Sequence, residues 1–103
     1  MFITNYNLVV ASLNNATVTS NTNILQSNFN PPYPGTLKIT VSVSSQSTFL
    51  VIINGNSFVA NNGQPLNPND IYYFEMPVVP GFSYNFQFGS NTTVTFYVIY
   101  NSQ

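Results

Sequence analysis

Very few side chains in this sequence could carry out chemistry. Only Lys38, Asp70 and Glu75 are formally charged, and the chain has neither His nor Cys. The commonest general base, the commonest metal ligand and the thiolate nucleophile are therefore missing. Asp70 and Glu75 stand five residues apart, so their side chains would point to opposite faces of a regular strand. We do not expect them to form the paired carboxylates of a glycosidase.

Other catalytic arrangements lack support as well. No Ser has a His that could act as its base, and neither a GxSxG stretch nor a glycine-rich phosphate-binding loop occurs. The stretch NPND (67–70) offers oxygen ligands but only one carboxylate, which is too few for a tight calcium site. The sequence therefore predicts a protein that is not an enzyme and that holds no metal or cofactor.

The shortage of charge also excludes classes of partner. Charged residues make up 3% of the 103 residues, against about 25% in a typical domain. The single Lys cannot neutralise the phosphates of a nucleic acid. No apolar run approaches the roughly 18 residues that a membrane-spanning helix needs. We therefore expect neither nucleic-acid binding nor membrane insertion.

Apolar and polar residues alternate along most of the chain, as in TLKITVSV (36–43) and FSYNFQF (82–88). A period of two is typical of half-buried strands in antiparallel sheets. The stretch 49–53 is apolar on both faces and should lie centrally, and Asn54–Gly55 after it favours a two-residue hairpin turn. The predicted strands are 6–11, 16–20, 22–26, 36–43, 48–53, 57–60, 71–76, 82–88 and 92–100.

Short strands with frequent turns predict an all-β fold, an antiparallel sandwich of jelly-roll type with essentially no helix. We expect one domain overall, with N-terminal strands or an arm in residues 1–30 and a β-sandwich core in residues 31–103. The proline-rich stretch SNFNPPYPG (27–35) lies between them. It is either an extended connection that crosses from one sheet to the other or a hinge toward a neighbouring subunit.

The aromatic residues are the best candidates for binding. The chain has 9 Phe and 7 Tyr, and four of these rings, Phe2, Tyr6, Phe29 and Tyr33, lie outside the strongest strand patterns. We expect these four to contact another chain, most simply in a closed homo-oligomer such as a trimer. Tyr combined with Asn and Ser also makes an uncharged, adaptable surface that suits stacking on sugars.

From Thr36 the sequence TLKITVSV, the later stretch FSYNFQF and the closing TTVTFYVIY resemble the small β domains of virion structural proteins. The similarity, in strand rhythm and in an Asn-, Thr- and Tyr-rich composition, is to minor capsid, decoration or turret proteins of bacterial and archaeal viruses. It implies a structural subunit at the virion surface that contacts itself and other capsid proteins. The alternatives are a carbohydrate- or receptor-binding module and a subunit of an extracellular filament.

Stability should depend little on pH. The chain has two carboxyl side chains and no His, so folding can be linked to the uptake of few protons in acid. We expect the melting temperature, followed by circular dichroism, to move by only a few degrees between about pH 3 and about pH 8. Unfolding near pH 4 would contradict this prediction, because it would place a carboxylate in a critical buried network.

Overall fold

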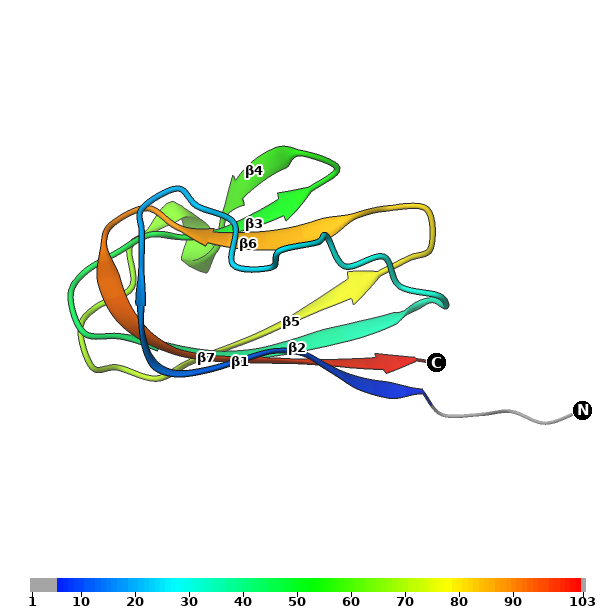
Figure 1. The fold of residues 1–103 in the computed structure, drawn as a ribbon, viewed down its shortest axis with the longest axis horizontal. Coiled ribbons are helices and arrows are strands. Elements are labelled where there is room, and N and C mark those ends of the chain that lie inside the picture. Colours follow the sequence, from blue (N-terminus) through cyan, green and yellow to red (C-terminus); the bar gives the residue numbers. More distant parts are fainter. Residues whose placement is uncertain (1–5, 103) are drawn as a thin grey trace, which may run out of the picture.

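A computed structural model describes residues 6–102, which form two antiparallel sheets packed face to face (Figure 1). The four-stranded sheet has the order β1 (Asn7–Val18), β7 (Thr92–Ser102), β2 (Gly35–Val43), β5 (Tyr72–Val78). The three-stranded sheet has the order β4 (Asn56–Val59), β3 (Phe49–Ile53), β6 (Tyr84–Phe88). The only helical element among residues 6–102 is one short 3₁₀ turn, η1 (Asn61–Gly63). None of the helical structure in this range is long and apolar enough to cross a membrane.

Residues 21–29, here called the flanking segment, extend the three-stranded sheet along the side of β6 away from β3. The backbone N–H of Asn21 donates to the carbonyl of Phe88, and that of Ile24 donates to the carbonyl of Phe86. Phe29 and Tyr84 exchange two backbone hydrogen bonds of 2.8 and 2.9 Å. The flanking segment thus runs antiparallel to β6 as an irregular strand, where the sequence predicts a regular strand over 22–26.

The pairing of the strands is that of a jelly roll. In that fold a long antiparallel ribbon is wrapped up, so that strand one pairs with eight, two with seven, three with six and four with five. When the flanking segment is counted as the second strand, all four pairings are present. β1 pairs with β7, the flanking segment with β6, β2 with β5, and β3 with β4. The predicted all-β, jelly-roll sandwich is confirmed.

Residues 30–34 connect the two sheets. The flanking segment before them is bonded to β6 of one sheet, and β2 after them belongs to the other. The three prolines in this stretch therefore lie in a connection outside the strands, where a missing backbone N–H costs little. Of the two interpretations of residues 27–35, the structure shows the connection that crosses from one sheet to the other, over residues 30–34.

β1 is one strand where the sequence predicts two, at 6–11 and 16–20. Its register with β7 shifts between Val9 and Ala11 and again between Leu13 and Ala16. Such shifts are β-bulges, in which extra residues are accommodated without ending the strand. Asn15 in the second bulge has a positive φ of 49°, and its backbone N–H donates to the Thr95 hydroxyl. The polar interruption at Asn14 and Asn15 is therefore a bulge within a strand.

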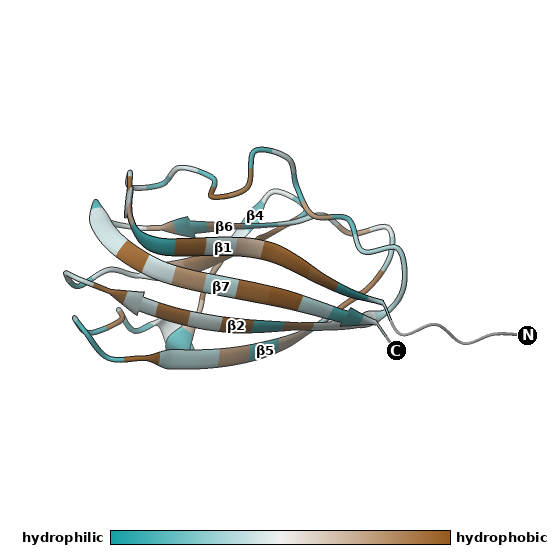
Figure 2. Ribbon diagram, turned by 60° about the horizontal axis from the view of Figure 1, so that its bottom comes forward, coloured by the Kyte–Doolittle hydropathy of each residue, from teal (hydrophilic) through white to brown (hydrophobic). Residues whose placement is uncertain are grey.

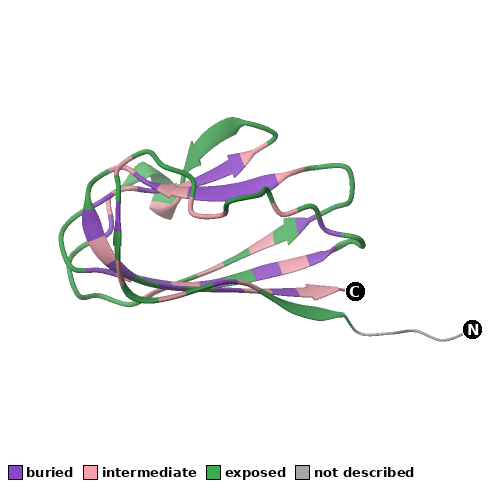
Figure 3. Cartoon of the chain, viewed as in Figure 1, coloured by how far each residue is buried: buried purple, intermediate pink, exposed green. Residues whose placement is uncertain are grey.

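The core lies between the sheets and is built mainly from alternate residues of the strands other than β4, whose four residues are all exposed. Figure 2 shows the resulting alternation of apolar and polar positions along the four-stranded sheet, and Figure 3 shows where the strands are buried. The central position predicted for residues 49–53 is confirmed, since β3 lies between β4 and β6. The residues that are 0% exposed are Leu37, Val41, Phe49, Leu66, Phe86, Phe88, Phe96, Val98 and Tyr100.

The turn between β3 and β4 is the predicted two-residue hairpin. Asn54 has a φ of 50° and Gly55 a φ of 81°, and the strands meet with Ile53 opposite Asn56. Positive φ at both central residues is the signature of a type I′ turn, whose twist matches that of the strands. The Asn54 side chain also accepts a hydrogen bond of 2.9 Å from the backbone N–H of Ser83. The same residue thus ties this turn to the start of β6.

The buried amide of Asn85 holds the flanking segment against β6. Asn85 is 1% exposed, and its Oδ1 accepts hydrogen bonds from the backbone N–H groups of Leu25 (3.0 Å) and Phe86 (2.8 Å). Its Nδ2 donates to the carbonyl of Leu25 (3.1 Å) and to Oδ1 of Asn28 (2.8 Å). The Asn85 side chain thus takes the place of backbone hydrogen bonds that the irregular flanking segment does not make with β6 at Leu25. No buried side-chain nitrogen or oxygen in the described part of the chain lacks a partner.

Replacing Asn85 by Ala should lower the free energy of unfolding by about 2 kcal/mol, because it leaves partly buried backbone groups of Leu25 without partners. Gln87 is a matched control, since its Nε2 donates to Oδ1 of Asn23 (2.7 Å) in the same segment but at an exposed site. Gln87→Ala should cost less than about 1 kcal/mol. Urea denaturation of both variants tests this difference, and equal costs would contradict it.

Candidate functional site: the outer face of the four-stranded sheet

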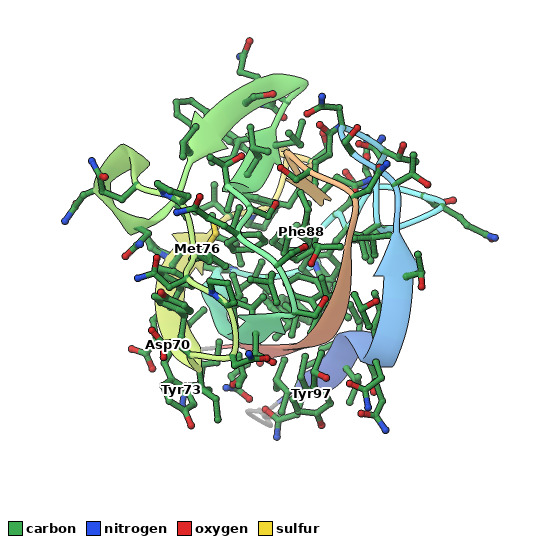
Figure 4. The ribbon with its side chains drawn as sticks, turned by 90° about the vertical axis from the view of Figure 1, so that its left-hand side faces the viewer. Asp70, Tyr73, Met76, Phe88 and Tyr97 are labelled. Carbon is green, nitrogen blue, oxygen red and sulfur yellow. The ribbon has the colours of Figure 1, made fainter. Side chains whose placement is uncertain are left out.

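The outer face of the four-stranded sheet carries two exposed tyrosines in one row. Tyr73 of β5 and Tyr97 of β7 both lie directly opposite Thr40 of β2, and Ser12 of β1 lies opposite Tyr97. Tyr73 is 75% exposed and Tyr97 is 40% exposed. Figure 4 shows both rings pointing away from the core, whereas Phe88 lies inside it. Along this row the two tyrosines stand about two strand spacings, or roughly 9.5 Å, apart.

Both tyrosines face outward because successive side chains of a strand point to opposite faces of the sheet. Residues 94, 96, 98 and 100 of β7 are buried, so residue 97 must face outward. On β5 the even-numbered residues pack against the core and the odd-numbered ones are exposed. The two side chains therefore need no special local structure, and the register of β2 with both neighbours brings them into line.

A second row on the same face contains the opposite charges of the chain. Lys38 of β2 lies between Glu75 of β5 and Ile99 of β7, and Val9 of β1 lies beyond Ile99. Lys38 and Glu75 are directly opposite each other in the register of β2 with β5. Opposite charges in one cross-strand pair favour the pairing and leave the face without net charge. The outer face is therefore neutral, with aromatic, aliphatic and hydroxyl groups.

The polar groups of this face are suited to binding. Asp70 lies in the exposed turn before β5, whereas Glu75 lies within the strand. Within residues 6–102 no group of three or more acidic, His or Cys side chains could hold a metal ion. The hydroxyls of Thr40, Ser12 and the tyrosines can donate and accept hydrogen bonds, and the rings offer apolar area. Such a surface suits a neutral partner.

A small hollow lies elsewhere, between the end of β1 and the flanking segment. It has a volume of about 300 Å³ and is lined by Leu13, Val18 and Ile24 together with several threonines. None of its lining residues is ionisable. It therefore offers a place for a small apolar group but no chemistry, and we do not regard it as the functional site.

Three of the four aromatic residues expected at an interface come together around Tyr100. Ring centroids lie 5.9 Å apart for Tyr6 and Tyr100, 5.1 Å for Phe29 and Tyr100, and 6.3 Å for Tyr6 and Tyr33. Phe29 is half-buried, whereas Tyr6 and Tyr33 are exposed. The fourth, Phe2, lies outside the described residues. Their role in contacts between chains stays a prediction.

Tyr73 and Tyr97 were not singled out from the sequence as site residues. The signal for them was present, because each occupies an odd-numbered position in a strand whose even-numbered positions carry the core. What the sequence could not supply is that β2 lies between their strands and places Thr40 opposite both. Their alignment is a property of the sheet order and the register.

No protein-family model matches the chain, and no curated sequence is significantly similar to it.

The hydroxyl of Tyr100 binds the backbone of Tyr33 in the aromatic cluster. It donates to the carbonyl of Tyr33 (2.6 Å) and accepts from the backbone N–H of Tyr33 (3.3 Å). Tyr100→Phe should therefore lower the free energy of unfolding by about 1–2 kcal/mol. Tyr97→Phe, on the exposed outer face, is the control and should cost less than about 0.5 kcal/mol. Urea denaturation measures both costs. A Tyr100→Phe variant as stable as the wild type would show that this hydroxyl does not secure residue 33.

Proposed function

We propose that the protein is a non-enzymatic structural subunit of a virus particle, a decoration, minor capsid or turret component at the particle surface. It attaches to neighbouring capsid proteins through the outer face of the four-stranded sheet. The observation that carries this proposal is the uncharged row of Tyr73, Thr40, Tyr97 and Ser12. The row beside it holds Val9 and Ile99 together with the opposite charges of Lys38 and Glu75. The cores of protein–protein interfaces are depleted of charge and enriched in Tyr, as the first of these rows is.

The jelly-roll fold supports the same class of function by analogy. Viral capsid domains and lectin domains both use this architecture. Because one fold hosts many functions, the fold alone does not choose between them. The resemblance of residues 36–100 to small virion proteins favours a structural role in a virus particle over the role of a lectin.

A second candidate function is the binding of a neutral carbohydrate on the same face. The observation that favours it is the spacing of Tyr73 and Tyr97, two exposed rings on either side of Thr40. Tyr rings combine an apolar face with a hydrogen-bonding tip, so two in a row can stack on two sugar units of one chain while nearby hydroxyls bind its oxygens. The sheet would then act as a platform for a polysaccharide or a glycosylated receptor.

The experiment that tests the proposal measures rebinding of the purified protein to particles stripped of it. Tyr73→Lys and Tyr97→Lys should each weaken rebinding by roughly tenfold or more, because each buries an unpaired charge in the contact. Phe82→Lys is the control, since Phe82 is an exposed aromatic residue (44%, close to the 40% of Tyr97) in the turn between β5 and β6, away from the row. It should change rebinding by less than about twofold.

The same variants distinguish the two candidates. If mass spectrometry of purified particles finds no trace of the chain, the structural role in a particle is wrong. Loss of binding to a neutral polysaccharide in the Tyr73 and Tyr97 variants, with retention in Phe82→Lys, would then establish the carbohydrate-binding role.

A further inference from the structure

β4 is an edge strand whose outer side is open. Within residues 6–102 it pairs with β3 alone, and all four of its residues are exposed (Figure 3). Phe58 shares the core-facing side of its sheet with Val51 and Phe86, its neighbours across the strands. It nevertheless remains 54% exposed. A large aromatic ring is therefore left uncovered on an unpaired edge.

The two outer strands of the other sheet carry features that oppose pairing with a further strand. β5 contains Glu75 and Pro77, and β1 is interrupted by two bulges. Charges, prolines and bulges at edges are devices that keep natural sheets from joining edge to edge. β4, with the sequence NSFV, has no charge and no proline, and its register with β3 is unbroken. Its only protection of this kind is its short length of four residues.

The hairpin turn fixes which backbone groups of β4 point outward. Ile53 and Asn56 close the two-residue turn as a hydrogen-bonded pair, and bonded and non-bonded pairs alternate along an antiparallel ladder. The backbone N–H of Ala60 donates to the carbonyl of Phe49 (2.9 Å), as this alternation requires. The N–H and C=O groups of Ser57 and Val59 therefore point away from β3, toward the open edge.

We propose that this edge pairs with β4 of a second copy of the chain, antiparallel and across a two-fold axis. Ser57 of each copy exchanges backbone hydrogen bonds with Val59 of the other, which satisfies both outward-pointing residues of each strand. The two Phe58 residues then face each other at the axis as a non-hydrogen-bonded pair, with Cα atoms about 4.5 Å apart. In this register the two exposed rings cover each other, and directly opposite aromatic pairs stabilise antiparallel strands.

The contact joins the two three-stranded sheets into one continuous sheet and uses the self-complementary geometry of a two-fold interface. It gives dimers, or pairs within a larger assembly, where the sequence alone led us to expect a trimer. It leaves the outer face of the four-stranded sheet free. The contact is therefore independent of the proposed function, and either can fail without the other.

Disulfide trapping tests the register, because the chain has no Cys of its own. Phe58→Cys should form a linked dimer under mild oxidation, since a Cα spacing of about 4.5 Å lies within the range for disulfides. Ser57→Cys on the same strand places the two thiols diagonally, with Cα atoms more than about 7 Å apart, and should not link. Tyr73→Cys, on the more exposed outer face, should not link either.

Sedimentation velocity tests the pairing without a cross-link. Over about a hundredfold range of concentration the wild type should shift from monomer to dimer. Ser57→Pro removes one outward-pointing N–H and leaves the bonds between β3 and β4 intact, so it should stay monomeric with an unchanged circular dichroism spectrum. Ser57→Thr keeps the N–H and should dimerise as the wild type does.

A wild-type chain that is monomeric throughout this range would overturn the proposal, and so would a folded Ser57→Pro variant that still dimerises. Linking of Phe58→Cys no faster than that of Tyr73→Cys would also overturn it. If Ser57→Pro does not fold, the cysteine variants test the proposal instead. It then stands only if Phe58→Cys links faster than Ser57→Cys and Tyr73→Cys do.

Discussion

The packing of Phe49 against the rings around it joins the two sheets. Its ring centroid lies 5.3 Å from that of Phe88 and 6.0 Å from that of Phe86, both on β6 of its own sheet. It lies 5.5 Å from Phe96 and 5.7 Å from Phe74, which belong to the opposite sheet. These separations are within the range in which aromatic pairs attract each other beyond simple burial. A chain with no Cys and three charged side chains depends on this apolar contact to hold its layers together.

Neutral amides and hydroxyls perform the polar tasks that charges perform elsewhere. Asn85 completes the sheet at the flanking segment, Tyr100 binds the backbone of Tyr33, and Asn54 ties a turn to β6. Of the 17 Asn residues, six have positive φ in the described range: Asn15, Asn21, Asn54, Asn61, Asn62 and Asn69. Asn tolerates this backbone region better than most residues. The abundance of Asn therefore reflects turns and bulges as well as solubility.

The periodicity of the sequence was sufficient to predict most of the fold. Alternation identified β2, β5, β6 and β7 to within a few residues, and the continuous apolar run 49–53 identified β3. Asn54–Gly55 identified the hairpin because its backbone requirement is local. The flanking segment was harder, because its hydrogen bonds are set by Asn85, a residue 60 positions from Leu25. In β1 the residues Asn14 and Asn15 interrupt the alternation in the same way that a strand end would. A period-two pattern also cannot say which strands are neighbours, so the row through Tyr73 and Tyr97 could not be found from it.

The order of the strands also decides when the chain can fold during its synthesis. β7 lies between β1 and β2, with Asn7 opposite Asn101 and Thr36 opposite the same Asn101. β1 therefore has no partner in its sheet until β7 has emerged from the ribosome, and β3–β4 is the pairing that local sequence can form early. Domains commonly fold as units while translation continues. This one must wait for β7, and until then the apolar faces of its strands need protection from other nascent chains.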